Sequence, residues 1–248
     1  MKILVIGESC RDIFHYGECK RLCPEAPVPV FKSIKTKQNG GMAMNVLNNL
    51  TTIQDGNIPT IITNRNWKEI KKTRFVEVNS NHMFLRLDEN DSSYGKINLS
   101  EYNQEFINTF DAIVISDYNK GFLSEEALKQ ISLMHPLTFL DTKKILGDWC
   151  KNFSFIKINS KEYENTKHIL TEQLLKNLIV TKGPKGCFYR DKIYPVSSVE
   201  VKDVSGAGDT FIAGLVSKFC ETRDIDMSIR YANECATIVV QKKGVSVV

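Results

Sequence analysis

Short apolar runs alternate along the chain with segments of helical periodicity. Runs of four to six mostly β-branched or aromatic residues predict buried strands, and we expect them at residues 2–6, 112–116, 137–140, 153–158 and 177–181. Amphipathic segments predict helices after Gly40 and Gly41, after Ser124, near residues 171–176, and over 208–221 and 227–241. This alternation predicts an α/β fold, in which a mostly parallel sheet is covered by helices on both faces.

Two further regions look like a small β appendage on that sheet. Pro27 and Pro29 flank Val28, which favours an edge strand, since proline cannot donate to a sheet ladder. Residues 73–78 and 82–87 predict a hairpin joined by turn-forming residues. We therefore expect a lid made of about residues 10–37 and 73–88. Residues 67–72 are compatible with a short helix.

Polar groups follow each of the clearer buried strands. Asp117, Asp141, Asn159 and Thr181 stand where apolar runs end. Ligands of open α/β sheets bind at the carboxyl ends of the strands. The sequence therefore predicts one crevice at which these groups converge.

The strongest local signal is the segment Asp-Val-Ser-Gly-Ala-Gly-Asp-Thr at 203–210, which leads into an apolar helix. Gly206 and Gly208, separated by Ala207, allow close approach of the backbone to a ligand. The start of a helix presents free N–H groups that suit phosphate oxygens. Asp209, which stands beside these N–H groups, is a candidate for the base that takes the proton of an attacking hydroxyl, as phosphoryl transfer requires. Alternatively, Asp209 is only a negative charge that stabilises the start of the helix.

Composition narrows the class of protein. The chain has 248 residues, of which 42% are hydrophobic and 25% charged, which is typical of a folded domain, and we expect a single one over 1–248. The net charge of +4 comes without a dense basic stripe, so we expect no nucleic-acid partner. No apolar stretch approaches the roughly 20 residues of a membrane span. We expect a cytoplasmic protein without a membrane partner.

Three motifs in order resemble the ribokinase-like (PfkB) sugar kinases over nearly the whole chain. Residues 203–209 resemble the carboxyl-terminal signature of that family. Residues 40–45, Gly-Gly-Met-Ala-Met-Asn, are similar to its Gly-Gly-x-x-x-Asn motif, and 159–162 match its Asn-x-x-Glu. The resemblance implies a ribokinase-like fold with a small β lid.

A narrower resemblance is to the kinase domain of the D-glycero-D-manno-heptose-7-phosphate kinases. It rests on Gly17 and on residues 24–30, 85–88, 116–121 and 244–246. In bacteria such kinases are often fused to an adenylyltransferase, and we expect no such second domain within 248 residues. The resemblance implies an ATP-dependent kinase whose acceptor is a sugar that already carries a phosphate, with that heptose 7-phosphate as the best candidate.

The resemblance also implies roles for individual positions. Asp209 is expected to be the general base, with an anion hole formed by Gly206, Ala207 and Gly208. The sugar is expected to contact Asp12, Gly40, Gly41 and Asn45, and its phosphate Arg86 and Lys143. ATP is expected to meet Asn159, Glu162, Thr181, Lys182, Gly183, Gly186 and Asn233. Glu162 is expected to contact Mg²⁺ through water. A monovalent cation is a further cofactor that the resemblance leaves open.

Two departures from the family pattern keep alternatives open. Thr142 stands where related kinases usually have proline, and residues 51–67 replace a strand, a Gly-x-x-Asp turn and a helix. A kinase for an unphosphorylated sugar or a nucleoside, and a non-catalytic nucleotide- or sugar-binding member of the family, therefore remain open. Because a two- or three-stranded lid exposes its edges, we also expect a homodimer formed through the lid.

Overall fold

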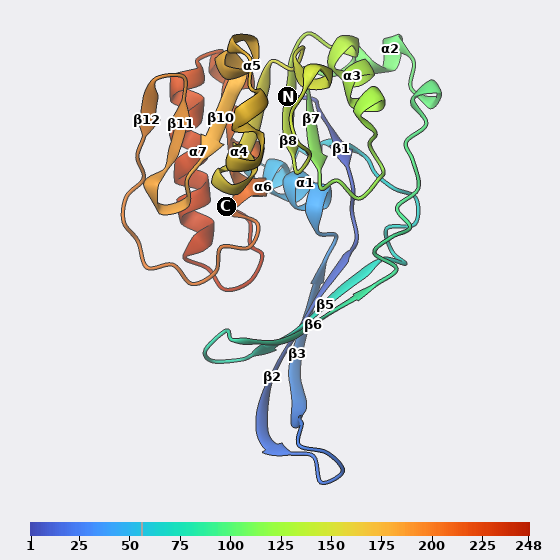
Figure 1. Ribbon diagram of the computed structural model, residues 1–248, viewed down its shortest axis with the longest axis vertical. Coiled ribbons are helices and arrows are strands. Elements are labelled where there is room, and N and C mark those ends of the chain that lie inside the picture. Colours follow the sequence, from blue (N-terminus) through green and yellow to red (C-terminus); the bar gives the residue numbers. More distant parts are fainter. Residues whose placement is uncertain (56) are drawn as a thin grey trace.

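The computed structural model describes residues 1–55 and 57–248, and its body is built around one eight-stranded sheet. The strand order is β12-β11-β10-β9-β8-β7-β1-β4 (Figure 1). The strands are β1 (Ile3–Gly7), β4 (Thr60–Ile62), β7 (Ala112–Asp117), β8 (Thr138–Thr142), β9 (Phe155–Asn159), β10 (Leu178–Thr181), β11 (Cys187–Tyr189) and β12 (Lys192–Tyr194). From β4 to β10 all neighbours are parallel, and β10, β11 and β12 pair antiparallel.

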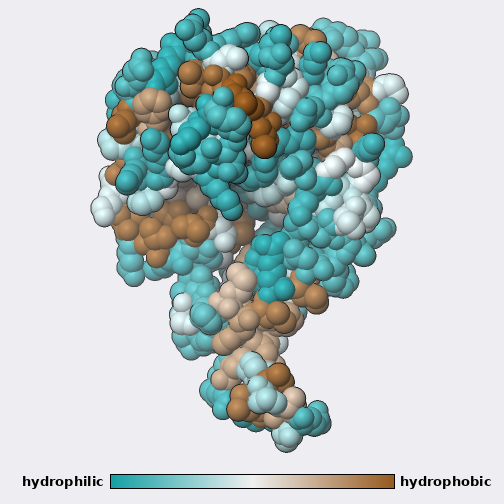
Figure 2. Space-filling view, in the orientation of Figure 1, coloured by the Kyte–Doolittle hydropathy of each residue, from teal (hydrophilic) through white to brown (hydrophobic). Residues whose placement is uncertain are grey.

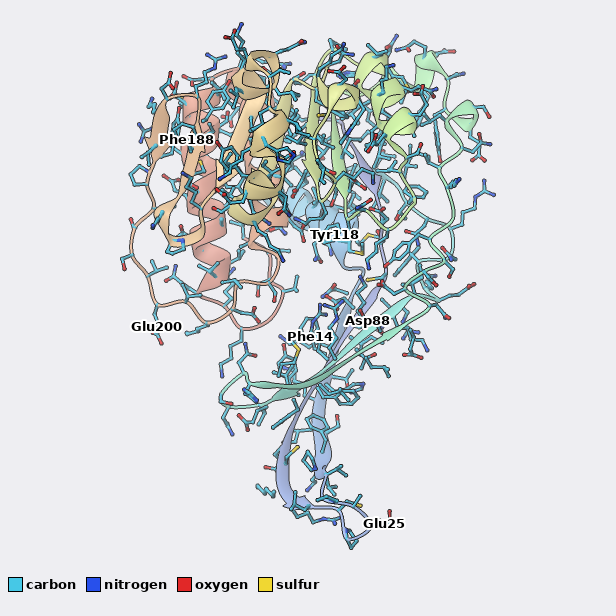
Figure 3. All side chains as sticks on the ribbon, in the orientation of Figure 1. Phe14, Glu25, Asp88, Tyr118, Phe188 and Glu200 are labelled. Carbon is cyan, nitrogen blue, oxygen red and sulfur yellow. The ribbon has the colours of Figure 1, made fainter. Side chains whose placement is uncertain are left out.

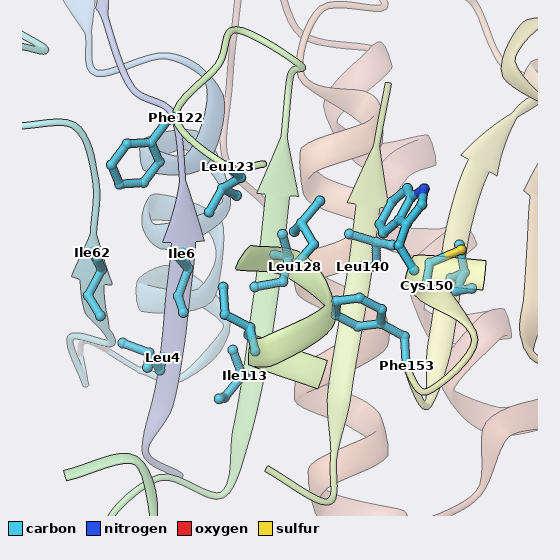
Figure 4. Close-up of a cluster of buried hydrophobic side chains, with 14 of the residues drawn as sticks. Leu4, Ile6, Ile62, Ile113, Phe122, Leu123, Leu128, Leu140, Cys150 and Phe153 are labelled. Carbon is cyan, nitrogen blue, oxygen red and sulfur yellow. The ribbon is translucent and has the colours of Figure 1, made fainter. Parts of the chain in front are cut away.

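Helices cover both faces of this sheet, as the sequence predicts. They are α1 (Met42–Ile53), α2 (Gln104–Ile107), α3 (Glu125–Met134), α4 (Ser160–Thr166), α5 (Glu172–Asn177), α6 (Ala207–Thr222) and α7 (Ile225–Val240). Alternate residues of β1 point to opposite faces. Ile3 and Val5 pack in the apolar cluster with α1, α6 and α7, while Leu4 and Ile6 join the cluster with α3 and α5 (Figure 4).

The lid is a separate four-stranded sheet that projects from the body (Figure 1). Its strand order is β3-β2-β5-β6, formed by β2 (Arg11–Leu22), β3 (Pro29–Asn39), β5 (Lys71–Glu77) and β6 (Met83–Glu89). The expected hairpin and edge strand are present. A helix at 67–72 is not formed: this segment is a turn, and Lys71 already pairs with Arg11 of β2. Pairing with a distant strand overrides the weak local helical pattern.

The segment between α1 and the lid adds little to the body. Among the described residues it supplies the three-residue strand β4, which pairs with β1 at the edge of the sheet, and no helix. The body sheet therefore stops one short strand beyond β1 on this side. Within the described ranges, no helix has the length and apolar character needed to cross a bilayer.

Candidate functional site

Asp209 lies where α1, α6 and the end of β7 meet. It is the third residue of α6, and one of its oxygens, Oδ2, accepts a hydrogen bond of 3.2 Å from Asn45 Nδ2 of α1. Its other oxygen, Oδ1, accepts a bond of 2.8 Å from the hydroxyl of Tyr118, which directly follows β7. The structure thus brings together Asp209 and Asn45, which the sequence assigned to the base and to the sugar pocket.

Burial tunes the acidity of this carboxyl. Asp209 is 3% exposed, and burial, followed by the nearby charge of Asp141, raises its pKa to about 6. The hydrogen bonds from Tyr118 and Asn45 and the charge of Lys157 act in the opposite direction. A carboxylate with this pKa is a stronger base than an ordinary aspartate and is still ionised at neutral pH.

The segment that leads into α6, residues 203–208, is called the anion loop below. Its two glycines differ in what favours them. Gly206 precedes α6 with a φ of 82°, in the left-handed region that favours glycine. At Gly208 a β-carbon would lie 2.9 Å from the ammonium nitrogen of Lys157, so a side chain there would require this ammonium to move. The start of α6 therefore lies next to a buried cation. The amide of Ala207 donates to the carbonyl of Val204 over 3.3 Å, so the amides that follow it in the first turn are the ones open to an anion.

Gly40 and Gly41 fix the start of α1 against the lid strand β2. Gly41 has a φ of 55°, and a β-carbon there would lie 3.0 Å from Cys10 Sγ and 3.4 Å from the β-carbon of Asp12. The amide of Cys10 donates to the carbonyl of Gly40 over 3.0 Å. Asp12 is buried at this junction and forms an ion pair with Arg74 of β5. These expected sugar-pocket residues are therefore neighbours.

Two arginines stand directly opposite each other on the lid. Arg74 of β5 pairs in register with Arg86 of β6, and Arg86 is held by Asp88 at 2.7 Å. Burial, and next the charge of Arg86, lower the pKa of Arg74. Figure 3 shows Asp88 and Phe14 on the lid and Tyr118 at the edge of the body that faces it. Like charges opposite one another destabilise a sheet, and here each arginine pairs with a carboxylate, Arg74 with Asp12 and Arg86 with Asp88.

Asn159 and Glu162 form a capping box at the start of α4. The Asn159 side chain accepts from the Glu162 amide at 3.0 Å, and Glu162 accepts from the Asn159 backbone and side-chain amides at 2.7 and 2.8 Å. Such reciprocal bonds stabilise a helix start. The Asn-x-x-Glu motif thus has a structural role whether or not it also meets a nucleotide.

Lys143 lies beside this capping box, and its ammonium nitrogen is 5.6 Å from the centre of the Tyr118 ring. Its ammonium is 2.7 Å from Glu162 Oε1 and 4.0 Å from Asp141 Oδ1. Burial acts to lower the pKa of Lys143, but the charges of Asp141 and Glu162 outweigh it and the net shift is upward. Lys143 is therefore a cation directly after β8, and its contact with the phosphate of the sugar stays a prediction, as does that of Arg86.

The remaining expected nucleotide residues surround the end of β10. Thr181 ends that strand, and the amide of Lys182 donates to the carbonyl of Gly186 over 2.7 Å. Gly183 and Gly186 have φ values of 55° and 80°. A β-carbon at Gly186 would lie 2.0 Å from a carbonyl of β12, while Gly183 is open. Asn233 of α7 is buried and donates to the carbonyl of Tyr194 over 2.9 Å, so it braces the β11–β12 hairpin.

Sequence reasoning missed three contacts of the crevice. Tyr118 is the hydrogen-bond partner of Asp209, and Lys157 forms a buried ion pair of 2.7 Å with Asp141. Thr142, at the position of the family proline, donates to Asp117 over 2.5 Å. A lone lysine inside the apolar run 153–158 was a readable signal for Lys157, because charged residues are rarely buried without a purpose.

The lid hairpin also touches the anion loop and the end of the chain. The Asn81 side chain is 3.3 Å from Asp203 Oδ2, and that carboxylate accepts from the Gly244 amide at 3.1 Å. Lys243 donates to the carbonyl of Asn79 over 2.6 Å. Val245 packs against an apolar lid cluster that includes Tyr16. The lid is thus closed onto the segment that leads into α6.

A protein-family model described as pfkB family carbohydrate kinase matches residues 47–247. Among curated proteins, the bifunctional protein HldE of Helicobacter pylori strain J99 is 29% identical over 294 residues, covering 98% of this chain and 63% of that protein. HldE of Campylobacter curvus is 30% identical over 297 residues, covering 98% and 62%. The chain thus spans about 63% of the length of these relatives. Because the alignments exceed 248 residues, the relatives carry residues that have no counterpart here.

Solved structures share the fold. A ribokinase from Thermotoga maritima matches with a TM-score of 0.75 at 15% identity, covering 99% of this chain and 94% of that one. A ribokinase of Arabidopsis thaliana, complexed with ribose and ATP, matches with a TM-score of 0.68 at 15% identity, covering 98% and 93%. At this identity the similarity establishes the ribokinase-like fold, which confirms the predicted fold class.

Proposed function

The chain belongs to the pfkB family of carbohydrate kinases, and on that basis we propose that it uses ATP to phosphorylate a hydroxyl group of a sugar that already carries a phosphate. The observation that carries the proposal is Asp209, held by Asn45 and Tyr118 at the start of α6. It combines a base for the acceptor hydroxyl with helix N–H groups for the phosphoryl oxygens, the two requirements of phosphoryl transfer.

In the proposed reaction Asp209 accepts the proton of the sugar hydroxyl. The hydroxyl oxygen forms a bond to the γ-phosphorus of ATP, and the bond from that phosphorus to the bridging oxygen breaks. ADP leaves with the electron pair, so charge and atoms balance. Gly206, Ala207 and Gly208 form the anion hole, in which the N–H groups of α6 stabilise the charge on the transferring group.

The lid supports a phosphorylated acceptor. Arg74 and Arg86 oppose each other on the lid, and a phosphate dianion would bind such a pair of guanidinium groups through charge-assisted hydrogen bonds. Asp12, which already holds Arg74, would bind sugar hydroxyls together with Gly40, Gly41 and Asn45. The similarity to HldE proteins and the resemblance to heptose-7-phosphate kinases make D-glycero-D-manno-heptose 7-phosphate the acceptor that we propose.

We place ATP over the ends of β9 and β10, with Thr181, Lys182, Gly183, Gly186 and Asn233 along the nucleotide. Within residues 1–55 and 57–248 no cluster of three acidic, histidine or cysteine side chains is suited to a metal. Both oxygens of Glu162 already accept hydrogen bonds. Mg²⁺, which keeps several waters, would thus be held mainly by ATP phosphates, neutralising their charge, with Glu162 contacting its water shell. An ATP-using enzyme of this kind belongs in the cytoplasm.

We also propose that two copies associate through the lid. Aromatic side chains of β2, β3 and β5 pack together on one lid face. The ring of Phe75 is 5.3 Å from that of His15, on which it stacks, and 5.3 Å from that of Phe31, which it meets edge to face. Leu85, opposite Phe75 on β6, is 58% exposed. Figure 2 shows apolar residues gathered along the projecting lid. A second copy would cover this face and the β3 edge.

A screen of ATP consumption across sugars and sugar phosphates tests the proposed activity. We expect turnover with a phosphorylated sugar well above that with its unphosphorylated counterpart. Arg86→Gln should raise KM for the phosphorylated sugar at least tenfold with a smaller effect on kcat. Equal background rates on every acceptor would refute the kinase proposal, and preference for an unphosphorylated sugar or a nucleoside would refute the phosphate site.

A further inference from the structure

Lys157 is a buried cation at the point where the anion loop begins α6. It lies on β9, is 2% exposed, and is the register partner of Asp141 on β8. Its ammonium nitrogen would be 2.9 Å from a β-carbon at Gly208. Because Gly208 has none, the ammonium sits directly against the backbone of the anion loop.

Below the strand ends, the face of the sheet that carries this charge is apolar. Phe155 and Phe139, two residues before Lys157 and Asp141 on their strands, pack in the cluster beneath α6. Burying an ion pair in such a place is costly, and apolar residues of similar volume would often be at least as stable. A structural purpose alone therefore gives a weak account of this pair.

The pair is also incompletely satisfied. The lysine ammonium has three N–H donors, and among the described residues its hydrogen-bond acceptor is Asp141 Oδ2, at 2.7 Å. Asp141 Oδ1 is buried without a hydrogen-bond partner there. The arrangement leaves N–H groups free for an anion at the start of α6, while Asp141 fixes the position of the ammonium.

We propose that Lys157 is a further catalytic residue, whose ammonium contacts the phosphoryl group as it passes from ATP to the sugar. This inference rests on the proposed kinase activity and adds a cation to the N–H groups of Gly206, Ala207 and Gly208. The ammonium of Lys157 places a positive charge on the side of the transferring phosphoryl group that faces the sheet. Preorganised donors of this type contribute about 10²–10³-fold to kcat.

Paired variants separate catalysis from charge balance. Lys157→Met leaves Asp141 buried without its partner, so we expect a lower urea midpoint as well as a kcat reduced by about 10²–10³-fold. The double variant Lys157→Met with Asp141→Asn removes both charges. We expect its urea midpoint to return close to wild type while kcat stays low. A double variant with wild-type kcat would show that Lys157 only neutralises Asp141 and would overturn the proposal.

A binding measurement needs no sugar and no turnover. Calorimetry with Mg²⁺ and either ATP or ADP gives the ratio of the two affinities, which measures the preference for the γ-phosphoryl group. In the double variant we expect this ratio to fall about tenfold, a typical effect of losing one charge-assisted contact. The control removes the ion pair of 3.1 Å between Lys72 of the lid strand β5 and Asp91, and should keep the preference.

An unchanged ATP preference in the Lys157 double variant would also overturn the proposal. If the wild type phosphorylates no acceptor yet prefers ATP through Lys157, the proposed acceptor fails and the lysine contact stands.

Discussion

The hydroxyl of Tyr118 donates a 2.8 Å hydrogen bond to Asp209 Oδ1, so the proposed base is held by a residue from the loop after β7. Burial, and next the charge of Asp209, raise the pKa of Tyr118 well above its ordinary value, so the tyrosine stays a proton donor. This hydrogen bond favours the ionised form of Asp209. Tyr118 therefore positions the base and keeps its carboxylate ionised near neutral pH.

Tyr118→Phe should shift the pH profile of the reaction. Loss of a hydrogen bond to a charged group, worth about 1.5–3 kcal/mol, raises the pKa of Asp209 further. We expect the acidic limb of kcat/KM to move up by about one to two pH units. Tyr94→Phe is the matched control, because Tyr94 donates a 2.8 Å bond to Asp91 and not to the base. An acidic limb that stays in place would contradict the positioning role.

Asp209→Asn should remove the base with little change in shape. General bases typically contribute about 10²–10⁴-fold, so kcat should fall by that order while calorimetry still detects ATP binding. In the wild type we expect kcat/KM to fall as the pH drops below about 6, the pKa of Asp209. Wild-type kcat in the variant would end the assignment of Asp209 as the base.

The same carboxyl should make stability depend on pH. Its pKa is raised from 3.8 to about 6 on folding, so the native state binds the proton more tightly than the unfolded chain. This group favours the native state most below about pH 4, and that contribution is lost as the pH rises through 6. At 1.36 kcal/mol per pKa unit the difference is roughly 3 kcal/mol.

Urea unfolding between pH 4 and 7 measures this effect. The wild type should lose stability relative to Asp209→Asn as the pH rises, since the variant lacks the titrating group. Parallel stability curves for the two proteins across this range would show that Asp209 has an ordinary pKa.

Glu162→Gln should raise the Mg²⁺ concentration required for half-maximal rate. Glutamine keeps an oxygen for the capping box with Asn159, so α4 should remain folded while the charge next to the proposed ion is lost. Circular dichroism checks the fold, and rate against Mg²⁺ concentration checks the role. Glu164→Gln, on the exposed side of the same helix, is the control. An unchanged Mg²⁺ requirement would leave Glu162 with its helix-capping function.

Leu85→Asp should convert the proposed dimer to monomers. The side chain is 58% exposed in one copy, so a charge there should disrupt association more than folding. Light scattering at micromolar concentration measures the mass, and KM for the sugar should rise with dissociation if the lid needs its partner. Ile193→Asp, at an exposed apolar site on β12, is the control. A wild-type mass equal to one chain at every concentration would refute the dimer.

The sequence by itself determined the elements and the ends of the strands. Apolar runs such as residues 112–116 predict buried strands because a strand covered on both faces has no polar face. Gly206 and Gly208 mark the anion loop because few other residues fit a left-handed or crowded backbone. The spacing of Asn159 and Glu162 is also typical of a capping box, in addition to its match with the family motif. These features depend on neighbours in the chain, so local patterns suffice to predict them.

Tertiary structure decided which side chains meet. Tyr118 and Asp209 are 91 residues apart, and Lys157 meets Asp141 through the register of two parallel strands. Arg74 stands opposite Arg86 because the β5–β6 register pairs the two residues. A one-residue change of register would turn each strand's side chains to the other face. Such contacts depend on packing between distant segments, and no local pattern in the sequence contains that information.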